Sequence, residues 1–392
     1  MPRHVPLTSV LTCIAILLAV SPCQSQHAPQ LWGGLEKGSY PVGFTVLNRR
    51  DESRKDSAGL GRPIQISVWY PAIDARSGDS MRFGEYFLLT ASQRTLVEPD
   101  SAAKADALHG FSAFLIRAGS SPDAAERWLQ SPVAARRNAT RANRRFPIVL
   151  AAQGSFESAY SQAILAEFLA SHGFVVATSP APLLLEPEAA PRKSLLDLAR
   201  MQATDLSFVL HEVASGGFGD STRIAVVAHS FGARSAFLLM TSRHIDGLVS
   251  LDGGIANRQG RDWLDSANVD LSKFTSPILH FYQDVDSTVT PDFSLLERVT
   301  AADRTIVKVA TIYHIDFTSV GFARAAFPAL AVAPPSPFLK SKTALVAELT
   351  LNFLRRVTNG DSQPSKQLLL TALRRSPELL VVRSMPRGVN TM

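Results

Sequence analysis

The stretch that decides the fold is "VVAHSFGARSA", residues 226–236, in which Ser230 stands between a hydrophobic run and a series of small residues. A tight corner from a strand into a helix needs small residues two places before and two places after such a serine, because two backbones pass close together there. Ala228 and Gly232 meet this requirement. The stretch therefore predicts a buried strand, a sharp corner at Ser230 and a helix that begins beside it.

Short apolar runs alternate with helical patterns on both sides of this corner. Runs without polar alternation are typical of strands buried on both faces, and intervening helices indicate a parallel sheet. The sequence thus predicts an α/β fold with a mostly parallel central sheet flanked by helices. The expected strands are "FPIVLAAQG" (146–154), "FVVATSPAP" (174–182), "DGLVSLDGG" (246–254), "PILHFYQ" (277–283) and "TIVKVATIYH" (305–314), and the expected helices include residues 158–173 and 194–216.

The rest of the chain divides around this pattern. "RPIQISVWYP" (62–71) predicts an early strand, after which residues 75–145 lose the strand rhythm and contain helical patterns. We expect residues 26–360 to form the main domain, with 75–145 as a helical insertion, or cap, after the early strand. Residues 361–392 form a basic end that is expected to be either a tail or an accessory helix.

The N-terminus predicts a secretion signal. "SVLTCIAILLAV" (9–20) is apolar but too short to span a bilayer, and the small residues Cys23 and Ser25 suit cleavage after Ser25. We therefore expect residues 1–25 to be a cleaved signal peptide and the mature protein to be secreted or periplasmic. Both cysteines, Cys13 and Cys23, lie in this leader, so the mature chain would hold no disulfide.

Charge adds little about partners. The formal net charge is +6, and "RRNATRANRR" (136–145) carries five arginines and no acid. Two interpretations are open: peripheral contact with an anionic surface, or simply solvated basic segments. No aromatic residues interleave with the arginines, which argues against nucleic-acid binding, and nothing indicates an oligomeric state. The scattered histidines show no metal-ligand spacing, so neither a metal nor another cofactor is expected.

A serine hydroxyl becomes a nucleophile only with a base in hydrogen-bond reach and donors for the oxyanion that develops. The corner aims the Phe231 N–H at the reacting carbonyl, so Phe231 is one expected donor. The second donor normally comes from the loop after an earlier strand, here "AAQGSF" (151–156). In that loop the Ser155 amide is the expected donor.

His314 is the expected base, because it follows the last strand of the sheet. His280 lies inside a strand and is interpreted as a core residue, and His244 follows the helix after the serine. His229, next to the serine, is expected to point away from it.

The acid that orients the base is left open by the residues alone. Asp252 ends one strand and precedes two glycines, whereas Asp284 and Asp286 end the next strand. A carboxylate at either position could orient an imidazole and stabilise its cationic form. The alternative interpretation of each of the three is an aspartate in a turn.

Six segments together resemble the α/β-hydrolase superfamily, and more closely its platelet-activating factor acetylhydrolase and dienelactone hydrolase-like group. The resemblance covers roughly residues 35–355 and implies Asp252 as the acid, with Ser155 and Phe231 as oxyanion donors. Gln153 and Ala228 depart from the histidine and glycine usual at those places, so substrate specificity does not carry over. The segments are "RPIQISVWYP", "PIVLAAQGS", "LASHGFVVAT", "AHSFGA", "SLDGG" and "HIDF".

The resulting expectation is a secreted serine hydrolase of small-molecule carboxylic esters, carboxylesterase or acetylhydrolase-like, with a role in lipid degradation. Ser230, Asp252 and His314 would form its catalytic triad, and the reaction would pass through an acyl-enzyme. Two other interpretations are a binding protein that kept the fold and lost catalysis, and an acyltransferase or peptidase that uses the same residues.

Overall fold

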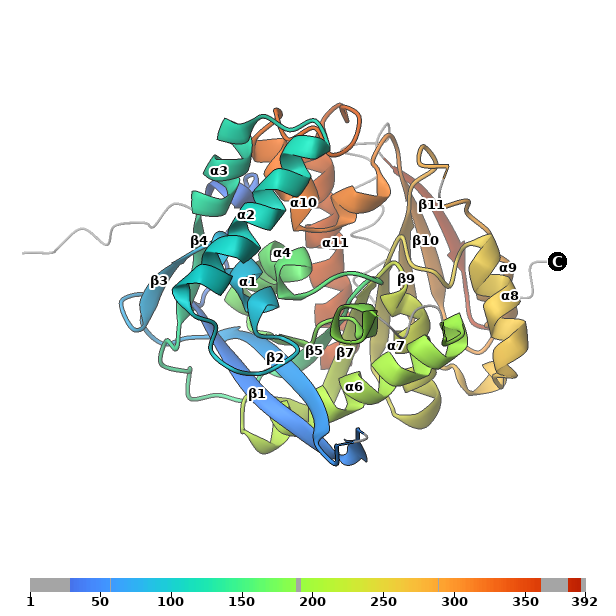
Figure 1. Cartoon of the computed structure of the whole chain (residues 1–392). Coiled ribbons are helices and arrows are strands. Elements are labelled where there is room, and N and C mark those ends of the chain that lie inside the picture. Colours follow the sequence, from blue (N-terminus) through green and yellow to red (C-terminus); the bar gives the residue numbers. More distant parts are fainter. Residues whose placement is uncertain (1–28, 57, 188–191, 288, 361–379, 389–392) are drawn as a thin grey trace, which may run out of the picture.

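The computed structural model describes residues 29–56, 58–187, 192–287, 289–360 and 380–388. The described residues form one eleven-stranded sheet in the order β11-β10-β9-β8-β7-β5-β6-β2-β1-β4-β3, with helices on both faces (Figure 1). The strands are β1 Val42–Lys55, β2 Gly61–Pro71, β3 Asp79–Arg82, β4 Pro132–Arg137, β5 Pro147–Ala152, β6 Val175–Thr178, β7 Asp220–His229, β8 Gly247–Leu251, β9 Ile278–Tyr282, β10 Arg304–Val309 and β11 Leu380–Met385.

The helices connect the strands and cover the sheet. Those of the α type are α1 Gly84–Leu88, α2 Ser101–Arg117, α3 Pro122–Gln130, α4 Ala159–Ser171, α5 Pro182–Leu185, α6 Leu195–Ser215, α7 Gly232–Ser242, α8 Arg258–Ala267, α9 Ser294–Arg298, α10 Ser319–Ala326 and α11 Leu339–Asn359. Short 3₁₀ helices are η1 Gln30–Trp32, η2 Leu89–Ala91, η4 Leu271–Lys273 and η5 His314–Phe317.

The centre of the sheet is parallel, as predicted. Strands β6, β5, β7, β8, β9 and β10 pair in parallel, and β2 joins β6 antiparallel. Along β5, Ile148 and Leu150 belong to the core under α6 and α7, whereas Val149 and Ala151 face the core under α4, α10 and α11. Because both faces are covered, such a strand is apolar at every position.

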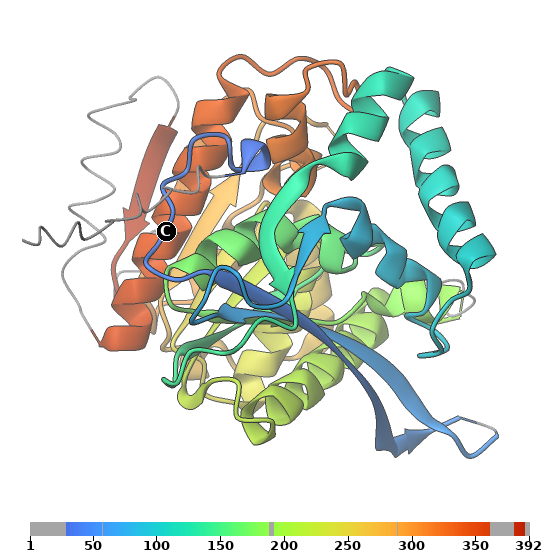
Figure 2. The ribbon, with the colours of Figure 1, turned by 90° about the vertical axis from the view of Figure 1, so that its left-hand side faces the viewer.

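Residues 75–145 contain helices α1, α2 and α3, and they also contain two strands that the sequence pattern did not predict. Strand β3 pairs antiparallel with β4, and β4 pairs in parallel with β1, so the segment lengthens the sheet at this edge. Figure 2 shows α2 and α3 beside the sheet, and β1 and β2 projecting from the body as a long hairpin. The expected helical insertion therefore contains its helices, and it also contributes two edge strands that were not expected.

A buried carboxylate ties this segment to the main body. Glu167 of α4 is fully buried and accepts hydrogen bonds from Trp32 Nε1 at 3.0 Å, Tyr86 Oη at 2.6 Å and Ala134 N at 3.0 Å. Burial raises the pKa of Glu167, and these donors oppose the shift. Two of the donors belong to the cap, in α1 and β4, and the third belongs to η1. The Glu167 side chain therefore connects the cap and the N-terminal segment to α4.

The C-terminal end differs from expectation where it is described. Leu380–Met385 is strand β11, antiparallel to β10, rather than an accessory helix or a free tail. The outer edge of β10 offers backbone partners to an extended segment, and "LVVRSM" contains two adjacent valines, which favour a strand. Residues 361–379, and the expected signal peptide 1–25, lie outside the described residues. No helix in the described part of the chain is long and apolar enough to cross a membrane.

Several arginines of the basic run make contacts within the chain. Arg136 donates to the carbonyls of Ser77 and Gly78, and Arg141 donates to the Gly216 carbonyl and lies over the Phe218 ring at 4.4 Å. Arg141, Arg144 and Arg145 also line an open groove of about 770 Å³. Contact of this run with an anionic surface stays a prediction.

Candidate active site

The chain turns sharply at Ser230, between β7 and α7. Its φ of +51° lies in the left-handed region, which costs energy for a residue other than glycine. Two backbone hydrogen bonds hold this conformation: the Ser230 N–H donates to the Leu251 carbonyl at 3.2 Å, and the Gly254 N–H donates to the Ser230 carbonyl at 2.7 Å. The corner is thus held by the loop that follows β8.

Gly232 is required by a close backbone approach. A Cβ atom at this position would lie 2.1 Å from the Ala152 carbonyl oxygen at the end of β5. Real Cβ atoms do not come so close to backbone, so the helix could accept a side chain here only by moving away from β5. This is the physical basis of the small-residue requirement seen in the sequence.

Gly232→Ala is therefore expected to lower the free energy of unfolding by about 1–3 kcal/mol, since an added methyl group must displace backbone. Urea unfolding measures the change. Gly110→Ala is the matched control: Gly110 lies inside α2 with nothing near its missing Cβ, so alanine should stabilise the protein by about 0.5–1 kcal/mol. Equal effects of the two substitutions would contradict the packing argument.

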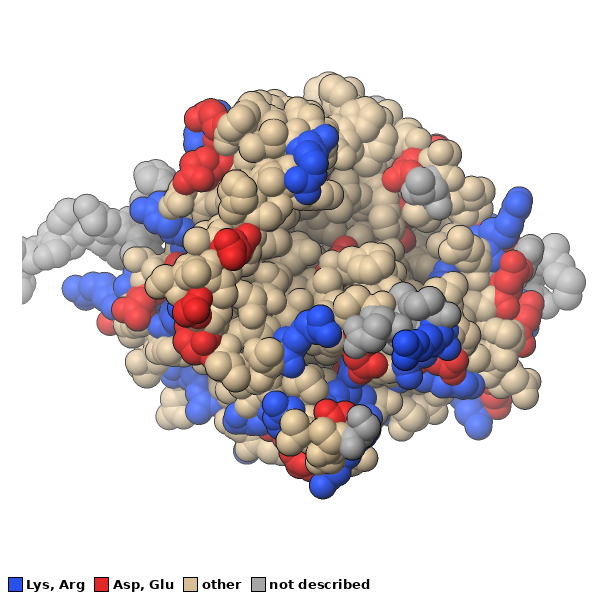
Figure 3. All heavy atoms as spheres, in the orientation of Figure 1, with Lys and Arg blue, Asp and Glu red and all other residues tan. Residues whose placement is uncertain are grey.

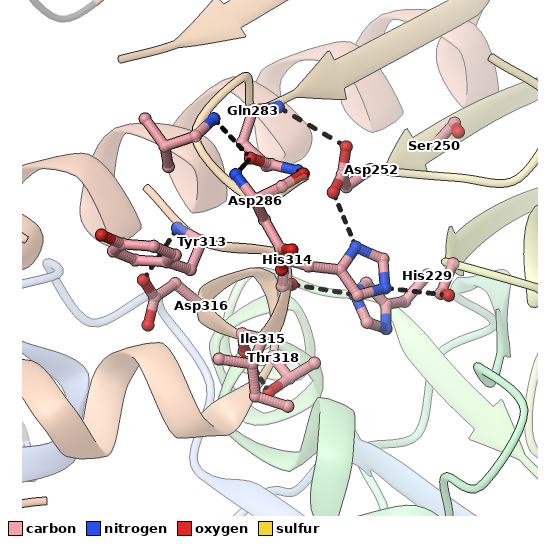
Figure 4. Close-up of polar contacts among 12 residues, drawn as sticks. His229, Ser250, Asp252, Gln283, Asp286, Tyr313, His314, Ile315, Asp316 and Thr318 are labelled. Atoms are coloured by element: carbon pink, nitrogen blue, oxygen red, sulfur yellow. Dashed lines mark hydrogen bonds and ion pairs between the residues drawn. The ribbon is translucent and has the colours of Figure 1, made fainter. Parts of the chain in front are cut away.

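The structure brings Ser230, His314 and Asp252 together. His314 Nε2 lies 2.9 Å from Ser230 Oγ, and His314 Nδ1 lies 2.6 Å from Asp252 Oδ2. These contacts join residues that are 84 and 62 positions apart in the chain. Figure 4 shows the Asp252 carboxylate pointing at the His314 ring. Ser230 and Asp252 follow the carboxyl ends of the neighbouring strands β7 and β8, and His314 lies in the segment after β10. Side chains converge at this end of a parallel sheet.

Asp252 is the carboxylate against His314, and it is 3% exposed. Its φ is +44°, and its N–H donates to the Phe281 carbonyl at 2.8 Å, which fixes the loop after β8 against β9. Asp284, which the residues alone left as an alternative, is ion-paired with Lys308. The backbone N–H of Asp286, the other alternative, donates to Gln283 Oε1 at 2.6 Å (Figure 4).

The loop that carries His314 is fixed by its own buried ion pair. The Tyr313 N–H donates to Asp316 Oδ2 at 3.0 Å, and Arg324 of α10 forms an ion pair with Asp316. Arg324 also donates to the Ala333 carbonyl at 2.9 Å. Both charged side chains are at most 4% exposed, so the position of η5 relative to α10 is tightly defined.

The expected oxyanion donors lie on the two loops that meet at the corner. Phe231 is the N-cap of α7, and N–H groups at a helix start have no acceptor within the helix. In the turn after β5, the Gly154 N–H donates to Glu157 Oε2 at 2.7 Å. The Gly154 amide is therefore occupied, and the partly exposed Ser155 carries the next amide of this turn.

Among the other histidines, His229 makes contacts that the sequence did not predict. Its Nδ1 lies 2.6 Å from Glu157 Oε1, and its ring lies 4.6 Å from that of His314. No short motif links His229 with Glu157, which is 72 positions away, so sequence reasoning missed the pair. His280 is buried in β9, as expected for a core residue. Burial lowers its pKa to about 4, which keeps it neutral.

An aromatic group joins the cap to α4. It comprises Phe87, Phe111, Phe114, Trp128 and Tyr160, with ring centroids 4.0 Å apart for Phe87 and Phe111 and 4.9 Å for Phe87 and Tyr160. Burial raises the pKa of Tyr160 to about 12, so its hydroxyl stays protonated and donates to the Phe156 carbonyl at 3.3 Å. The Phe156 and Phe114 side chains are 63% and 55% exposed.

The surface is hollowed near the centre of the face that Figure 3 presents, over the region between α4, α10 and β9. The walls of this hollow carry few charged side chains (Figure 3). The described residues contain no group of three or more His, Cys, Asp or Glu side chains that could hold a metal ion.

Comparison with known proteins identifies the fold class without reference to the site residues. No family model matches the chain. Chlorophyllase type 0 from Chenopodium album is 30% identical over 98 residues, which are 24% of this chain and 28% of that relative's length. The solved ferulic acid esterase from Streptomyces cinnamoneus matches with a TM-score of 0.60 at 21% identity, over 88% of this chain and 96% of that one. This likeness confirms the predicted fold class: the chain has the α/β-hydrolase fold.

Proposed function

We propose that the protein is a serine hydrolase that cleaves carboxylic esters through an acyl-enzyme. The observation that carries this proposal is the 2.9 Å contact of His314 Nε2 with Ser230 Oγ, with Asp252 at 2.6 Å on the other side of the ring. Both distances lie within the hydrogen-bond reach of about 2.6–3.2 Å that proton transfer needs. The names of the similar proteins, an esterase and a chlorophyllase, agree with this reaction class.

In the first half of the reaction, His314 Nε2 takes the proton of Ser230 Oγ while this oxygen attacks the carbonyl carbon of the ester. The Asp252 carboxylate accepts from His314 Nδ1–H, which holds the reactive tautomer and stabilises the imidazolium that forms. The carbonyl oxygen becomes an oxyanion, for which the Phe231 and Ser155 N–H groups are the donors.

The tetrahedral intermediate then collapses. His314 gives its proton to the leaving alcohol oxygen, the C–O bond breaks, and the acyl group stays on Ser230 Oγ. In the second half, His314 deprotonates a water molecule that attacks the acyl carbon. The acid is released and Ser230 regains its proton. The chain's own residues perform every proton transfer in this scheme.

The substrate side of the proposal rests on the cap. Exposed Phe156 follows Ser155 in the turn expected to bind the oxyanion, and Tyr160 links this turn to the aromatic group of α1, α2 and α3. The exposed Phe156 ring beside this turn favours an ester with an apolar or aromatic acyl group. Because the leader and its cleavage pattern predict export, we place this activity outside the cytoplasm, in the periplasm or the medium.

A panel of p-nitrophenyl esters of increasing acyl length tests the proposal, together with a fluorophosphonate probe that labels only activated serines. We expect turnover of at least one ester and labelling of Ser230. Folded protein that hydrolyses none of the esters and takes up no probe would overturn the proposal and favour a binding protein on this fold.

A further inference from the structure

A buried pair of side chains outside the three residues above connects the two loops that the reaction needs. His229 ends β7 and Glu157 lies in the turn between β5 and α4, with side chains 1% and 15% exposed. Glu157 Oε1 lies 2.6 Å from His229 Nδ1. Neither residue contacts Ser230 or Asp252 in the hydrogen bonds described above, so the reaction scheme leaves this pair without a role.

The partners of His229 fix where its protons are. Nε2 lies 3.2 Å from the backbone carbonyl oxygen of His314, and a carbonyl only accepts, so Nε2 carries a hydrogen. Nδ1 faces a carboxylate oxygen, and one proton lies between them. Burial alone would lower the pKa of His229, but the Glu157 charge outweighs burial and leaves this pKa raised. The pKa of Glu157 is lowered in turn, despite burial, by His229 and the Gly154 amide. Hydrogens on both ring nitrogens, one of them facing a carboxylate, fit a charge-assisted pair.

Each member of the pair holds one loop. Glu157 Oε2 accepts from the Gly154 N–H at 2.7 Å, which closes the turn that carries Ser155. The Glu157 N–H donates to the Gly154 carbonyl at 3.2 Å, and the Glu157 carbonyl accepts from the Ala181 N–H at 2.9 Å. The turn is thus fixed on both sides by this one residue.

The other member holds the catalytic base. Besides its hydrogen bond to the His314 carbonyl, the His229 ring packs against the His314 ring, with centroids 4.6 Å apart and planes inclined by 32°. Figure 4 shows the two rings side by side. His229 also precedes Ser230 directly in the chain, so the pair touches the nucleophile's corner, the base and the oxyanion turn.

We propose that His229 and Glu157 form a positioning unit, which sets the oxyanion turn and His314 at the correct distances from Ser230. This inference rests on the proposed function. The reaction requires the Ser155 amide and the His314 ring to meet the same carbonyl group of the substrate. A displacement of about 1 Å in such a site can cost about 10²-fold in rate.

Three substitutions of Glu157 test separately whether its side-chain length or its negative charge is required. In Glu157→Gln, Oε1 can still accept from Gly154 N–H, and Nε2 can donate to Nδ1 of a neutral His229, so reach is kept and charge is lost. Glu157→Asp keeps the charge but is one methylene shorter, so it cannot meet both partners. Glu157→Ala removes both properties. His229→Ala and the double alanine variant complete the set.

The control substitutions are His172→Ala and Glu212→Gln. His172 is the C-cap of α4, where its Nδ1 lies 2.9 Å from the Phe168 carbonyl, so it resembles His229 in contacting a backbone carbonyl. It lies about 20 Å along α4 from the site, at 1.5 Å per residue. Glu212 pairs with Arg49 near the surface. Neither control should change kcat.

The measurements are kcat and KM for the best p-nitrophenyl ester, with kcat calculated per site that fluorophosphonate can label. We expect Glu157→Ala and His229→Ala to lower kcat by about 10- to 10²-fold with little change in KM, because positioning acts in the transition state. Glu157→Gln should retain more kcat than Glu157→Asp. The double variant should lose no more than the worse single variant, since the two residues act as a unit.

A trifluoromethyl ketone that mimics the oxyanion supplies a second readout. Its affinity should fall by the same factor as kcat/KM in the alanine variants, which a loss of stability elsewhere would not produce. If an alanine variant does not fold, the comparison of Glu157→Gln with Glu157→Asp decides alone.

Four results with an active parent protein would overturn the inference and leave the proposed function intact. They are greater activity in Glu157→Asp than in Glu157→Gln, multiplied losses in the double variant, a change confined to KM, and wild-type kcat in both alanine variants. An inactive and unlabelled parent protein would instead refute the proposed function, and this inference with it.

Discussion

Replacing Ser230 with alanine is expected to lower kcat for ester hydrolysis by roughly 10⁴- to 10⁶-fold, because no other atom can take the place of Oγ as the nucleophile. The remaining rate would come from water attack on an ester bound beside the oxyanion donors. The fold should survive, since the Oγ atom's hydrogen bond described here is the one to His314 at 2.9 Å, and alanine and serine pay a similar cost at a φ of +51°.

The measurements are kcat with a p-nitrophenyl ester, fluorophosphonate labelling and the midpoint of thermal unfolding. Ser242→Ala is the matched control. Ser242 ends the same helix, and its hydroxyl donates to the Leu239 carbonyl at 3.0 Å, so its loss should leave kcat unchanged. Substantial labelling of the Ser230→Ala protein would show that another residue carries the reactivity.

Asp252→Asn is expected to lower kcat by about 10⁴-fold at neutral pH. An asparagine side chain fits the same space, but its NH₂ group can face His314 Nδ1 and favour the tautomer with the proton on Nε2. That tautomer cannot accept the proton of Ser230. Loss of the carboxylate also removes the charge that stabilises the imidazolium during the reaction.

Asp284→Asn tests whether this effect is specific to one strand end. Asp284 is ion-paired with Lys308, so removing its charge should cost at most about 1 kcal/mol in stability and leave kcat unchanged. The ratio of the two kcat values is the decisive number. If Asp284→Asn were the slower enzyme, the acid would have to reach His314 from the loop after β9, and the assignment of Asp252 would be wrong.

The centre of the fold could be predicted from the sequence because its strands are covered on both faces. Such strands lack any polar alternation, and the corner at Ser230 adds a local signature of small residues. The edge strands escaped prediction for the opposite reason. Of the four residues of β3, only Met81 is buried, so no periodic pattern marks this strand. It pairs with β4, which follows it in the chain only after helices α1, α2 and α3.

Residues of the candidate site could be predicted where a short stretch of sequence marks them. Ser230 has a motif, and His314 has a defined place after the last parallel strand. The acid has neither signal, because Asp252 and Asp284 both follow strands. Choosing between these two carboxylates requires the directions of their side chains, which only the three-dimensional structure gives. Glu157 and His229 have no sequence signal at all, because their contact depends on how two loops meet above the sheet.

The position of β11 has a consequence for biosynthesis. A ribosome delivers this strand after every other strand of the sheet, so the outer edge of β10 stays open while the rest of the nascent domain can already pair. An open edge is a template for another chain, and such edges promote aggregation. Until β11 has paired, the outer edge of β10 is therefore the part of the sheet at which another chain could add a strand.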